Sequence, residues 1–375
     1  MSNIIVKEVK TKKEIKDFIL FPTKLFKGVH NYVPCMYGDE LKVLNRKTTY
    51  EKESKTEFYI AYIDNKVVGR IQVLVQYTYN KKANAKQARF TRFDCINDYE
   101  VAKALFDKAI AWAKEQGMDT IVGPLDYSDL EREGLLIEGF DEYMTFEEQY
   151  HPSYYQGLIE QYGFTKDVDW LEFELRFNED TAARLDKIAK AVTRFAKVKL
   201  APIERKDKYI KKYKRDVFNL IEVCYGKLYG TMPLSDETID SIIDQFLFVI
   251  DPEFLPVAVN EHNEVIGFAL CVPSISPVLA GTDGKLTLPR LLKLLKTIKN
   301  PKCLELLLVA VRPDYQKLGV NALFLSNITK TIKRRNIEFA ETNLNLETNE
   351  AVMAQWKQFN ARHHKRRRCF KLELQ

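Results

Sequence analysis

Residues 304–324 read LELLLVAVRPDYQKLGVNALF, and this stretch decides the fold. The pattern predicts a buried strand, a tight loop over residues 316–321 (QKLGVN), and then the start of a helix. Such a loop aims several backbone N–H groups and the positive end of the helix dipole at one point, which favours a phosphate. Gly319 has no Cβ atom, so the backbone can approach the anion. We interpret the loop as a pyrophosphate-binding turn; the alternative is an ordinary strand-to-helix connection.

Composition favours two globular domains. The chain has 375 residues, and its 46% hydrophobic residues are enough for two cores. The net charge of +6 suits an anionic ligand as well as it suits nucleic acid. Six cysteines without a C-x-x-C pair indicate reduced thiols, so we expect a cytoplasmic protein with neither disulfides nor a metal site. Charges interrupt the first apolar stretch, and no apolar run is long enough to span a membrane.

The sequence carries an internal repeat. Residues 57–75 and 254–272 both read as a strand, a polar turn, V-V-G or V-I-G, and a second strand. A further strand, an amphipathic helix, a strand, a helix and a last strand follow each hairpin. In the first copy these are residues 88–96, 98–116, 120–123, 153–162 and 169–177; in the second they are 304–311, 319–335, 338–346, 350–359 and 366–374.

This order predicts an α/β (α+β) fold with mixed sheets in two similar domains, residues 1–180 and 181–375. Residues 17–26 and 211–225 are expected as leading helices of the two copies. Residues 287–300 form an insert in the second copy, which we expect to be an amphipathic helix.

A strand ending in Val311-Arg312-Pro313, followed by Q-x-x-G-x-(small) and a helix, resembles the GNAT superfamily of N-acetyltransferases. The order of elements extends this resemblance over both halves, so it implies a tandem GNAT fold in which each half is a twisted mixed sheet flanked by helices. It also implies an N-acyltransferase that moves an acetyl or longer acyl group from CoA to an amine. The co-substrate would be acetyl-CoA or a longer acyl-CoA, with its pyrophosphate on the loop amides.

The resemblance assigns binding residues along one strand, one loop and one helix. Backbone groups near Val309 and Val311 would pair with pantetheine, and Gln316 and Gly319 match the family's loop. Asn321 stands where the family usually has Gly or Ala. The cofactor-binding residues expected on this basis are Val309, Val311, Gln316, Lys317, Leu318, Gly319, Val320, Asn321 and Asn349.

Trp356 departs from the family pattern. In the helix that starts near Asn349, it takes the place of a tyrosine that often protonates the leaving CoA thiolate. An indole N–H cannot serve as an acid at neutral pH. An ordinary thiol has a pKa near 8.5, so the thiolate can leave without an acid.

The first copy lacks the anion loop. Residues 94–100 (DCINDYE) contain no glycine and place three carboxylates where the phosphate would lie. Asn97 or Asp98 would cap the following helix instead. We therefore expect the first domain not to bind CoA and to act as a scaffold or to shape the acceptor site.

Amine acylation needs a base, and two glutamates are candidates. Glu305 lies on the strand before the loop, and Glu341 lies on the next strand, where it would share a face with Asn343, Asn345 and Glu347. Burial would raise the pKa of such a carboxyl group and make it a better base. The alternative is that these side chains line a wet surface.

Two further segments have open interpretations. Residues 123–140 make a long excursion that would cover an acceptor pocket or brace the domain interface, with Asp126, Tyr127 and Glu138 as polar candidates. The basic run at residues 362–368 (RHHKRRR) would contact a CoA phosphate, nucleic acid or an anionic membrane, or would be a solvated final hairpin, which we favour.

The acceptor is expected to be a small amine, a lipid precursor or a peptide. We do not expect nucleic acid as a partner, and peripheral contact with a membrane is left open. One rival hypothesis is an aminoacyl-tRNA-dependent transferase with paired GNAT-like domains. Another is a non-catalytic binding or scaffold protein that keeps the fold.

Overall fold

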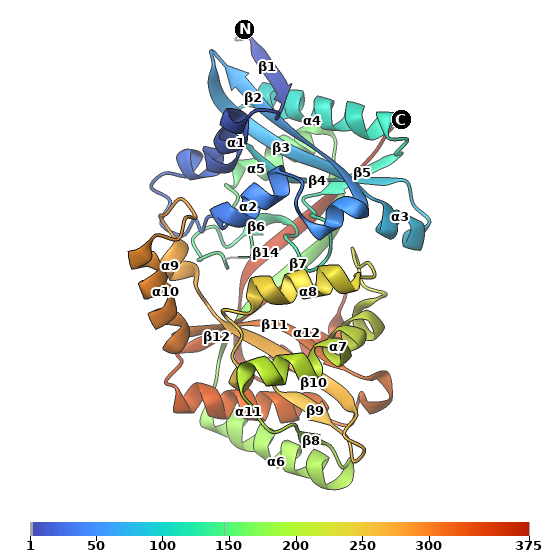
Figure 1. The fold of residues 1–375 in the computed structure, drawn as a ribbon, viewed down its shortest axis with the longest axis vertical. Coiled ribbons are helices and arrows are strands. Elements are labelled where there is room, and N and C mark those ends of the chain that lie inside the picture. The colour runs from blue at the N-terminus through green and yellow to red at the C-terminus, as the bar shows by residue number, and fades with distance from the viewer. Residues whose placement is uncertain (1–2, 146, 375) are drawn as a thin grey trace.

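The computed structural model describes residues 3–145 and 147–374. Two similar halves lie one above the other in Figure 1 and share one continuous sheet. The first half contains β1 (Ile4–Glu8), α1 (Lys12–Leu25), α2 (Tyr37–Leu44), η1 (Thr49–Lys52), β2 (Ser54–Ile63), β3 (Lys66–Gln76), α3 (Tyr77–Ala83), β4 (Gln87–Cys95), α4 (Tyr99–Glu115), β5 (Thr120–Gly123), β6 (Leu135–Glu138), α5 (Tyr154–Tyr162) and β7 (Thr165–Arg176).

The second half repeats this order with additional helices. It contains α6 (Glu179–Phe195), β8 (Lys199–Leu200), α7 (Lys206–Tyr225), α8 (Asp236–Phe246), η2 (Pro252–Phe254), β9 (Val257–Val259), β10 (Val265–Pro273), α9 (Ser276–Leu279), α10 (Leu288–Lys299), β11 (Cys303–Val311), η3 (Pro313–Tyr315), α11 (Val320–Arg334), β12 (Phe339–Thr342), β13 (Asn345–Leu346), α12 (Glu350–Trp356) and β14 (Asn360–Glu373). The predicted mixed α/β class and the internal repeat are confirmed.

The two matching glycines of the repeat have a packing role. Gly69 lies opposite Cys95, and Gly267 lies opposite Val311, so both occupy the same place in their sheets. A Cβ atom on Gly69 would lie 2.8 Å from Leu105 Cδ1, and one on Gly267 would lie 2.9 Å from the Ala310 carbonyl oxygen. A side chain would therefore force a shift at both places, of the Leu105 side chain on α4 at Gly69 and of the neighbouring strand's backbone at Gly267.

The last strand of each repeat is exchanged between the halves. Among the described residues, fourteen strands form one sheet whose main path is β1-β2-β3-β4-β5-β14-β7-β12-β11-β10-β9-β8. Strand β14 therefore lies between β5 and β7 of the first half, and β7 borders β12 of the second. Figure 1 shows β14 (red) running from the lower half into the upper one. The boundary at residue 180 stays a prediction, because each half's sheet is completed by the other's strand.

Helices cover both faces of the sheet in the second half. Alternate residues of β10 point to opposite sides, so Phe268 packs in the core under α7, and Ala269 packs in the core under α6 and α11. Strand β12 is short and pairs with β11. The next strand, β13, is separate from it and pairs with β7 but not with β11. The prediction of one strand over residues 338–346 is therefore wrong. No described helix is long and apolar enough to cross a bilayer.

Candidate functional site

The predicted anion loop joins β11 to α11. Gly319 is the N-cap residue of α11 with φ of +83°, and Lys317 has φ of +68°. No described group accepts a hydrogen bond from the backbone amides of Lys317, Gly319, Val320 or Asn321. Four free N–H groups at the positive end of a 15-residue helix form the geometry that binds an anion.

The side chains of the loop fix its ends. Gln316 Nε2 donates to the carbonyl oxygen of Val311 at 3.0 Å, so the loop is tied back to its own strand. Val320 is buried in the core under α6, whereas Leu318 is about half exposed. The loop is thus anchored at both ends while its amide groups remain available.

Strands β11 and β12 form a wedge beside this loop. They pair in parallel from Cys303 to Leu306 and separate after that residue. A shift of register between β10 and β11 leaves Leu307 without a partner in β10, as in a β-bulge. Beyond the bulge, the edge of β11 that would face β12 is free of strand partners.

Two side chains of α7 occupy this open edge. The hydroxyl group of Tyr225 donates to the carbonyl oxygen of Val309 at 2.7 Å and accepts from its amide at 3.1 Å. Cys224 Sγ donates to the carbonyl oxygen of Val311 at 3.3 Å. The backbone groups that we expected to pair with pantetheine are therefore bonded to α7 in this structure. Burial raises the pKa of Tyr225 to about 12, so the phenol stays protonated at neutral pH.

A cavity of about 260 Å³ opens from the wedge. Val309, Asn321 and Asn349, three of the predicted binding residues, line it, and the buried Asn321 Oδ1 has no hydrogen-bond partner among the described groups. One side of the cavity is an apolar chamber under α7 and α8, formed by Ile210, Tyr213, Val217, Phe218, Ile221, Ile242, Ile243, Phe246, Ile250, Leu255, Phe268 and Leu270.

Carboxyl groups from the first half form the opposite wall. These are the side chains of Asp129, Glu131, Glu133, Glu147 and Glu148. Burial raises the pKa of Asp129 to about 6, of Glu131 to about 7 and of Glu148 to about 8. Burial also raises the pKa of Glu133 and Glu147 well above the ordinary value. We name these five residues the carboxylate wall. Removing water from so many acidic groups is costly unless a cation joins them.

Neither predicted base lines the cavity; the two lie side by side in the sheet, next to Leu306 and Thr342, which do line it. Glu305 of β11 is paired in register with Glu341 of β12, and only 1% of Glu305 is exposed. Neither carboxylate oxygen of Glu305 makes a hydrogen bond of normal geometry with a described group, although the Ser274 hydroxyl is close enough to lower the pKa. Burial prevails and, with the Glu341 charge, raises the pKa of Glu305 to about 8.

Glu341 differs from Glu305 because it has a cationic partner. Lys365 Nζ lies 3.5 Å from a carboxylate oxygen of Glu341 and 3.0 Å from one of Glu172. Burial nevertheless raises the pKa of Glu341. The charge of Glu305 raises the pKa of Glu147, which belongs to the carboxylate wall, so the buried glutamates and the cavity are electrostatically connected.

The geometry matches known proteins of one architecture. A tandem GNAT protein from the clavulanic acid biosynthesis pathway superposes with a TM-score of 0.59 at 12% identity, over 100% of this chain and 99% of that one. A GCN5-related N-acetyltransferase from Sphaerobacter thermophilus gives a TM-score of 0.53 at 11% identity, over 99% and 96% of the two chains. The chain has the tandem GNAT fold.

Two curated proteins are similar in sequence. Protein YghO of Escherichia coli (strain K12) is 25% identical over 99% of this chain and 95% of its own length. The Bacterial ceramide synthase of Caulobacter vibrioides is 24% identical over 84% of this chain and 82% of its own. No protein-family model matches the chain.

Within the GNAT fold, Trp356 takes a structural position. Its indole N–H donates to Asn345 Oδ1 at 3.1 Å, and its ring lines the cavity. Asn343 and Asn345 also line the cavity, whereas Glu347 turns away and pairs with Lys166. The four alternating residues 341, 343, 345 and 347 therefore do not share one face, because the strand breaks after Thr342.

The basic run is not a solvated hairpin, and that prediction is wrong. Residues 362–368 lie in β14 at the centre of the shared sheet, where Lys365 and Arg367 are fully buried. Arg367 Nε donates to Glu172 at 2.9 Å, and Arg368 Nε donates to Asp169 at 2.8 Å. Acidic residues of β7 thus neutralise the run, and their partnership depends on the strand exchange.

The excursion over residues 123–140 reaches the cavity, but the residues that line it are not the ones predicted from the sequence. Asp126 is buried, and its Oδ2 atom lies 2.6 Å from Arg92 Nη1 in an ion pair. Tyr127 stacks on Tyr50. Glu138 forms an ion pair with Arg366 at the surface. The cavity is lined instead by Asp129, Leu130, Glu131 and Glu133. The density of carboxylates in DYSDLERE was the available signal.

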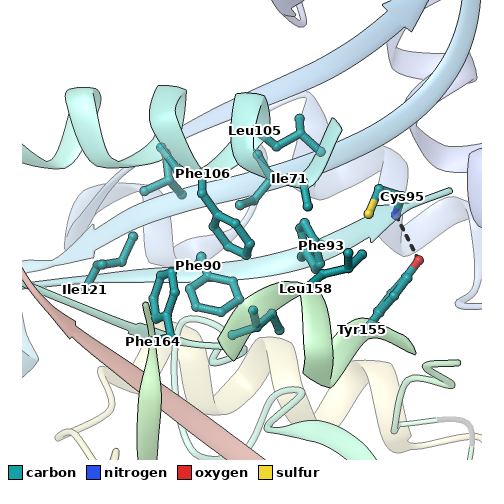
Figure 2. Close-up of a cluster of buried hydrophobic side chains, with 14 of the residues drawn as sticks. Ile71, Phe90, Phe93, Cys95, Leu105, Phe106, Ile121, Tyr155, Leu158 and Phe164 are labelled. Atoms are coloured by element: carbon teal, nitrogen blue, oxygen red, sulfur yellow. Dashed lines mark hydrogen bonds between the residues drawn. The ribbon is translucent and has the colours of Figure 1, made fainter. Parts of the chain in front are cut away.

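In the first half, aromatic side chains fill the equivalent wedge. Tyr155 of α5, the counterpart of α12, accepts a hydrogen bond from the amide of Cys95 at 2.9 Å (Figure 2). Phe93 and Phe106 stack beside it with ring centroids 4.6 Å apart. Asp98 caps α4 through the Glu100 amide at 2.9 Å, as predicted. That this half binds no CoA stays a prediction, which the filled wedge supports.

Proposed function

We propose that the protein is an N-acyltransferase that transfers a long acyl chain from CoA to an amine. A fold does not define a function, which depends on the geometry and chemistry of the site. The observation that carries it is the continuity between the wedge at β11 and the apolar chamber under α7 and α8. A thioester in the wedge would have its acyl chain directed into that chamber, whereas an acetyl group would leave the chamber empty.

The donor site would be built around α11. The free amides of Lys317, Gly319, Val320 and Asn321 would hold the pyrophosphate. Pantetheine would pair with Val309 and Val311 along β11 as an additional strand, once the Tyr225 hydroxyl has left Val309. The apolar side chains of Val217, Ile221, Ile243 and Leu255 would surround the acyl chain.

The acceptor would enter past the carboxylate wall. An amine is protonated at neutral pH, and an ammonium group beside this wall would favour the ionised form of the carboxyl groups and pair with it. The similarity to a protein named Bacterial ceramide synthase favours a lipid amine among the acceptor classes. An acceptor of this kind presents one cationic group on an apolar body, which fits a cavity with one acidic and one apolar wall.

Before the nitrogen can attack, one proton of the ammonium group must be removed. We assign this role to Glu305, which has a pKa of about 8 and no salt-bridge partner, in preference to Glu341, which faces Lys365. The free amine nitrogen then attacks the thioester carbonyl carbon, and the C–S bond breaks as the amide C–N bond forms. The nitrogen releases its second proton to solvent in this step. CoA leaves as a thiolate, whose low basicity makes an acid at the position of Trp356 unnecessary.

Thermal unfolding with CoA, acetyl-CoA and palmitoyl-CoA tests the proposal. At about 100 times Kd, a bound ligand should add about 2.7 kcal/mol of stability. We expect stabilisation by all three, with palmitoyl-CoA binding most tightly, followed by amide formation with a long-chain amine. Equal affinity for acetyl-CoA and palmitoyl-CoA would contradict the long-chain assignment. The absence of any shift would exclude a CoA-dependent enzyme and leave the tRNA-dependent or non-catalytic alternatives.

A pair of variants localises the donor site. Lys317→Glu places a carboxylate beside the free amides and should weaken binding of all three CoA compounds by at least about tenfold, or about 1.4 kcal/mol. Lys108→Glu makes the same change of charge on exposed α4 in the first half and should have no effect. If both variants bind like the wild type, the loop is not the donor site.

A further inference from the structure

Helix α10 presents leucine side chains to solvent. Leu288, Leu291, Leu292 and Leu295 recur at the spacing of one helical face, and all four are exposed. The exposed fractions are 71% for Leu288, 61% for Leu292 and 52% for Leu295. Isolated exposed leucines are common, but a contiguous apolar stripe of this kind marks an interaction surface.

The neighbouring face of the helix, beside the leucine stripe, holds it on the protein. Leu294 and Ile298 pack in a core cluster with Leu307 of β11. Before the helix, the Gly284 carbonyl oxygen accepts a hydrogen bond from the amide of Tyr37 at 3.0 Å, which joins the insert to α2 of the first half. The exposed leucines are therefore not a frayed segment, and Figure 1 shows α10 at the outer flank of the molecule.

Cations border the leucine stripe. Residues 284–302 contain Lys285, Arg290, Lys293, Lys296, Lys299 and Lys302 but no acidic residue. Within residues 3–145 and 147–374, no carboxylate forms a salt bridge with Lys293, Lys296 or Lys299, and all three are exposed. An exposed apolar stripe beside unpaired lysines is typical of a helix that lies in the interface of an anionic membrane.

We propose that α10 docks the protein on an anionic phospholipid bilayer. The leucine stripe (Leu288, Leu291, Leu292 and Leu295) enters the acyl layer, while Lys293, Lys296 and Lys299 contact the headgroups. A bilayer satisfies both features because its negative surface lies directly above its apolar interior. The helix has 12 residues, too few to span, so it lies parallel to the surface. Docking does not depend on the proposed acyl transfer, and it is measured without it.

Cosedimentation of the full chain with vesicles tests this proposal. We expect binding to phosphatidylcholine vesicles that contain phosphatidylglycerol, weaker binding to phosphatidylcholine alone, and release by salt. Leu288→Glu combined with Leu292→Glu should abolish binding. Val223→Glu, which alters an exposed apolar residue of α7, should bind like the wild type.

The lysines are tested separately from the leucines. Replacing Lys293, Lys296 and Lys299 by Gln should weaken binding to the anionic vesicles by about 100-fold, and replacing all three by Arg should restore it. Circular dichroism shows whether each variant is folded. Equal binding to neutral and anionic vesicles, or unchanged binding of the folded leucine variant, would overturn the proposal. The proposal would also be overturned if the wild type formed a dimer and did not bind vesicles, and the leucine variant no longer formed that dimer. A second copy of the chain would then cover the stripe.

Discussion

The hydroxyl group of Tyr225 bridges the carbonyl oxygen and the amide nitrogen of Val309, at 2.7 and 3.1 Å. It thereby satisfies both groups on the open edge of β11, as a neighbouring strand would. In the proposed complex, pantetheine makes these same two bonds. The free protein therefore holds its donor site in a self-bonded state, from which the Tyr225 hydroxyl must be displaced.

Removing this hydroxyl should improve acyl-CoA binding. In Tyr225→Phe, the ligand no longer competes with an internal partner for Val309, so the Kd of palmitoyl-CoA should fall about fivefold, or about 1 kcal/mol. The free protein should lose about 1 kcal/mol of stability towards urea for the same reason. Titration calorimetry and urea unfolding measure the two effects. Tyr213→Phe, on the same helix and the same cavity wall, is the control. Weaker binding by Tyr225→Phe would show that the hydroxyl contacts the ligand.

The size of the apolar chamber should set the acyl length. Val217 of α7 is buried in its wall, so Val217→Trp would fill the space in which the chain is proposed to lie. We expect the variant to keep its affinity for CoA and acetyl-CoA but to lose its preference for palmitoyl-CoA. Overpacking should cost about 1–3 kcal/mol of stability. The folded fraction of the variant is therefore measured first, and its binding is corrected for that fraction. Val223→Trp, on the exposed face of the same helix, should leave chain preference unchanged. An unaltered preference in Val217→Trp would place the acyl chain elsewhere.

Tyr155 should be important for the stability of the first half and not for catalysis. Its hydroxyl group is the partner of the buried Cys95 amide, and it also lies 3.3 Å from Asp94 Oδ1. Tyr155→Phe leaves that amide unpaired, so we expect a loss of about 1–3 kcal/mol in urea unfolding. Binding of CoA, at one molecule per chain by calorimetry, should be unchanged. Tyr99→Phe, whose hydroxyl makes only a long bond of 3.5 Å, is the control. Two bound CoA molecules per chain would refute the scaffold role of this half.

The sequence predicted local features well because short-range patterns determine them. The loop at residues 316–321, the Asp98 cap and the two hairpins each depend on a few neighbouring residues, and the repeat made the hairpin visible twice. The exchange of β7 and β14 has no such signature. The hydrophobic pattern of a strand is the same whether its partner strand lies in its own half or in the other half.

The same limit explains the errors at the site. Arg367 and Glu172 are 195 residues apart, so the basic run looked solvated until its acidic neighbours were placed. The carboxylate wall comes from one half and the apolar chamber from the other, and no periodicity connects them. The burial of Glu305 was predictable because a single glutamate in an apolar strand is visible in the sequence, whereas its role as a base stays a prediction.

Glu305 should make the proposed activity and the stability of the folded protein depend on pH in the same range. The pKa of this carboxyl group is raised from 4.5 to about 8, chiefly by burial. Between these values the folded protein holds a proton that the unfolded chain has released. Stability therefore falls as the pH rises through this window, by about 1.4 kcal/mol per pH unit for such a group. Glu131 and Glu148, with pKa values of about 7 and about 8, add to the wild-type slope.

Glu305→Gln isolates the contribution of this one residue. Glutamine has no proton to lose, so the variant should unfold at higher urea concentration than the wild type above pH 5, with a difference that grows up to about pH 8. The same substitution removes the proposed base. The wild-type rate should rise with pH up to about 8, because only the ionised carboxylate accepts a proton, and the variant should be slower by about 10²–10⁴-fold and lack that rise. Glu138→Gln, at an exposed carboxylate, should change neither property. A stabilised variant that keeps the wild-type rate would show that Glu305 is buried and protonated but is not the base, and Glu341 would then be tested in the same way.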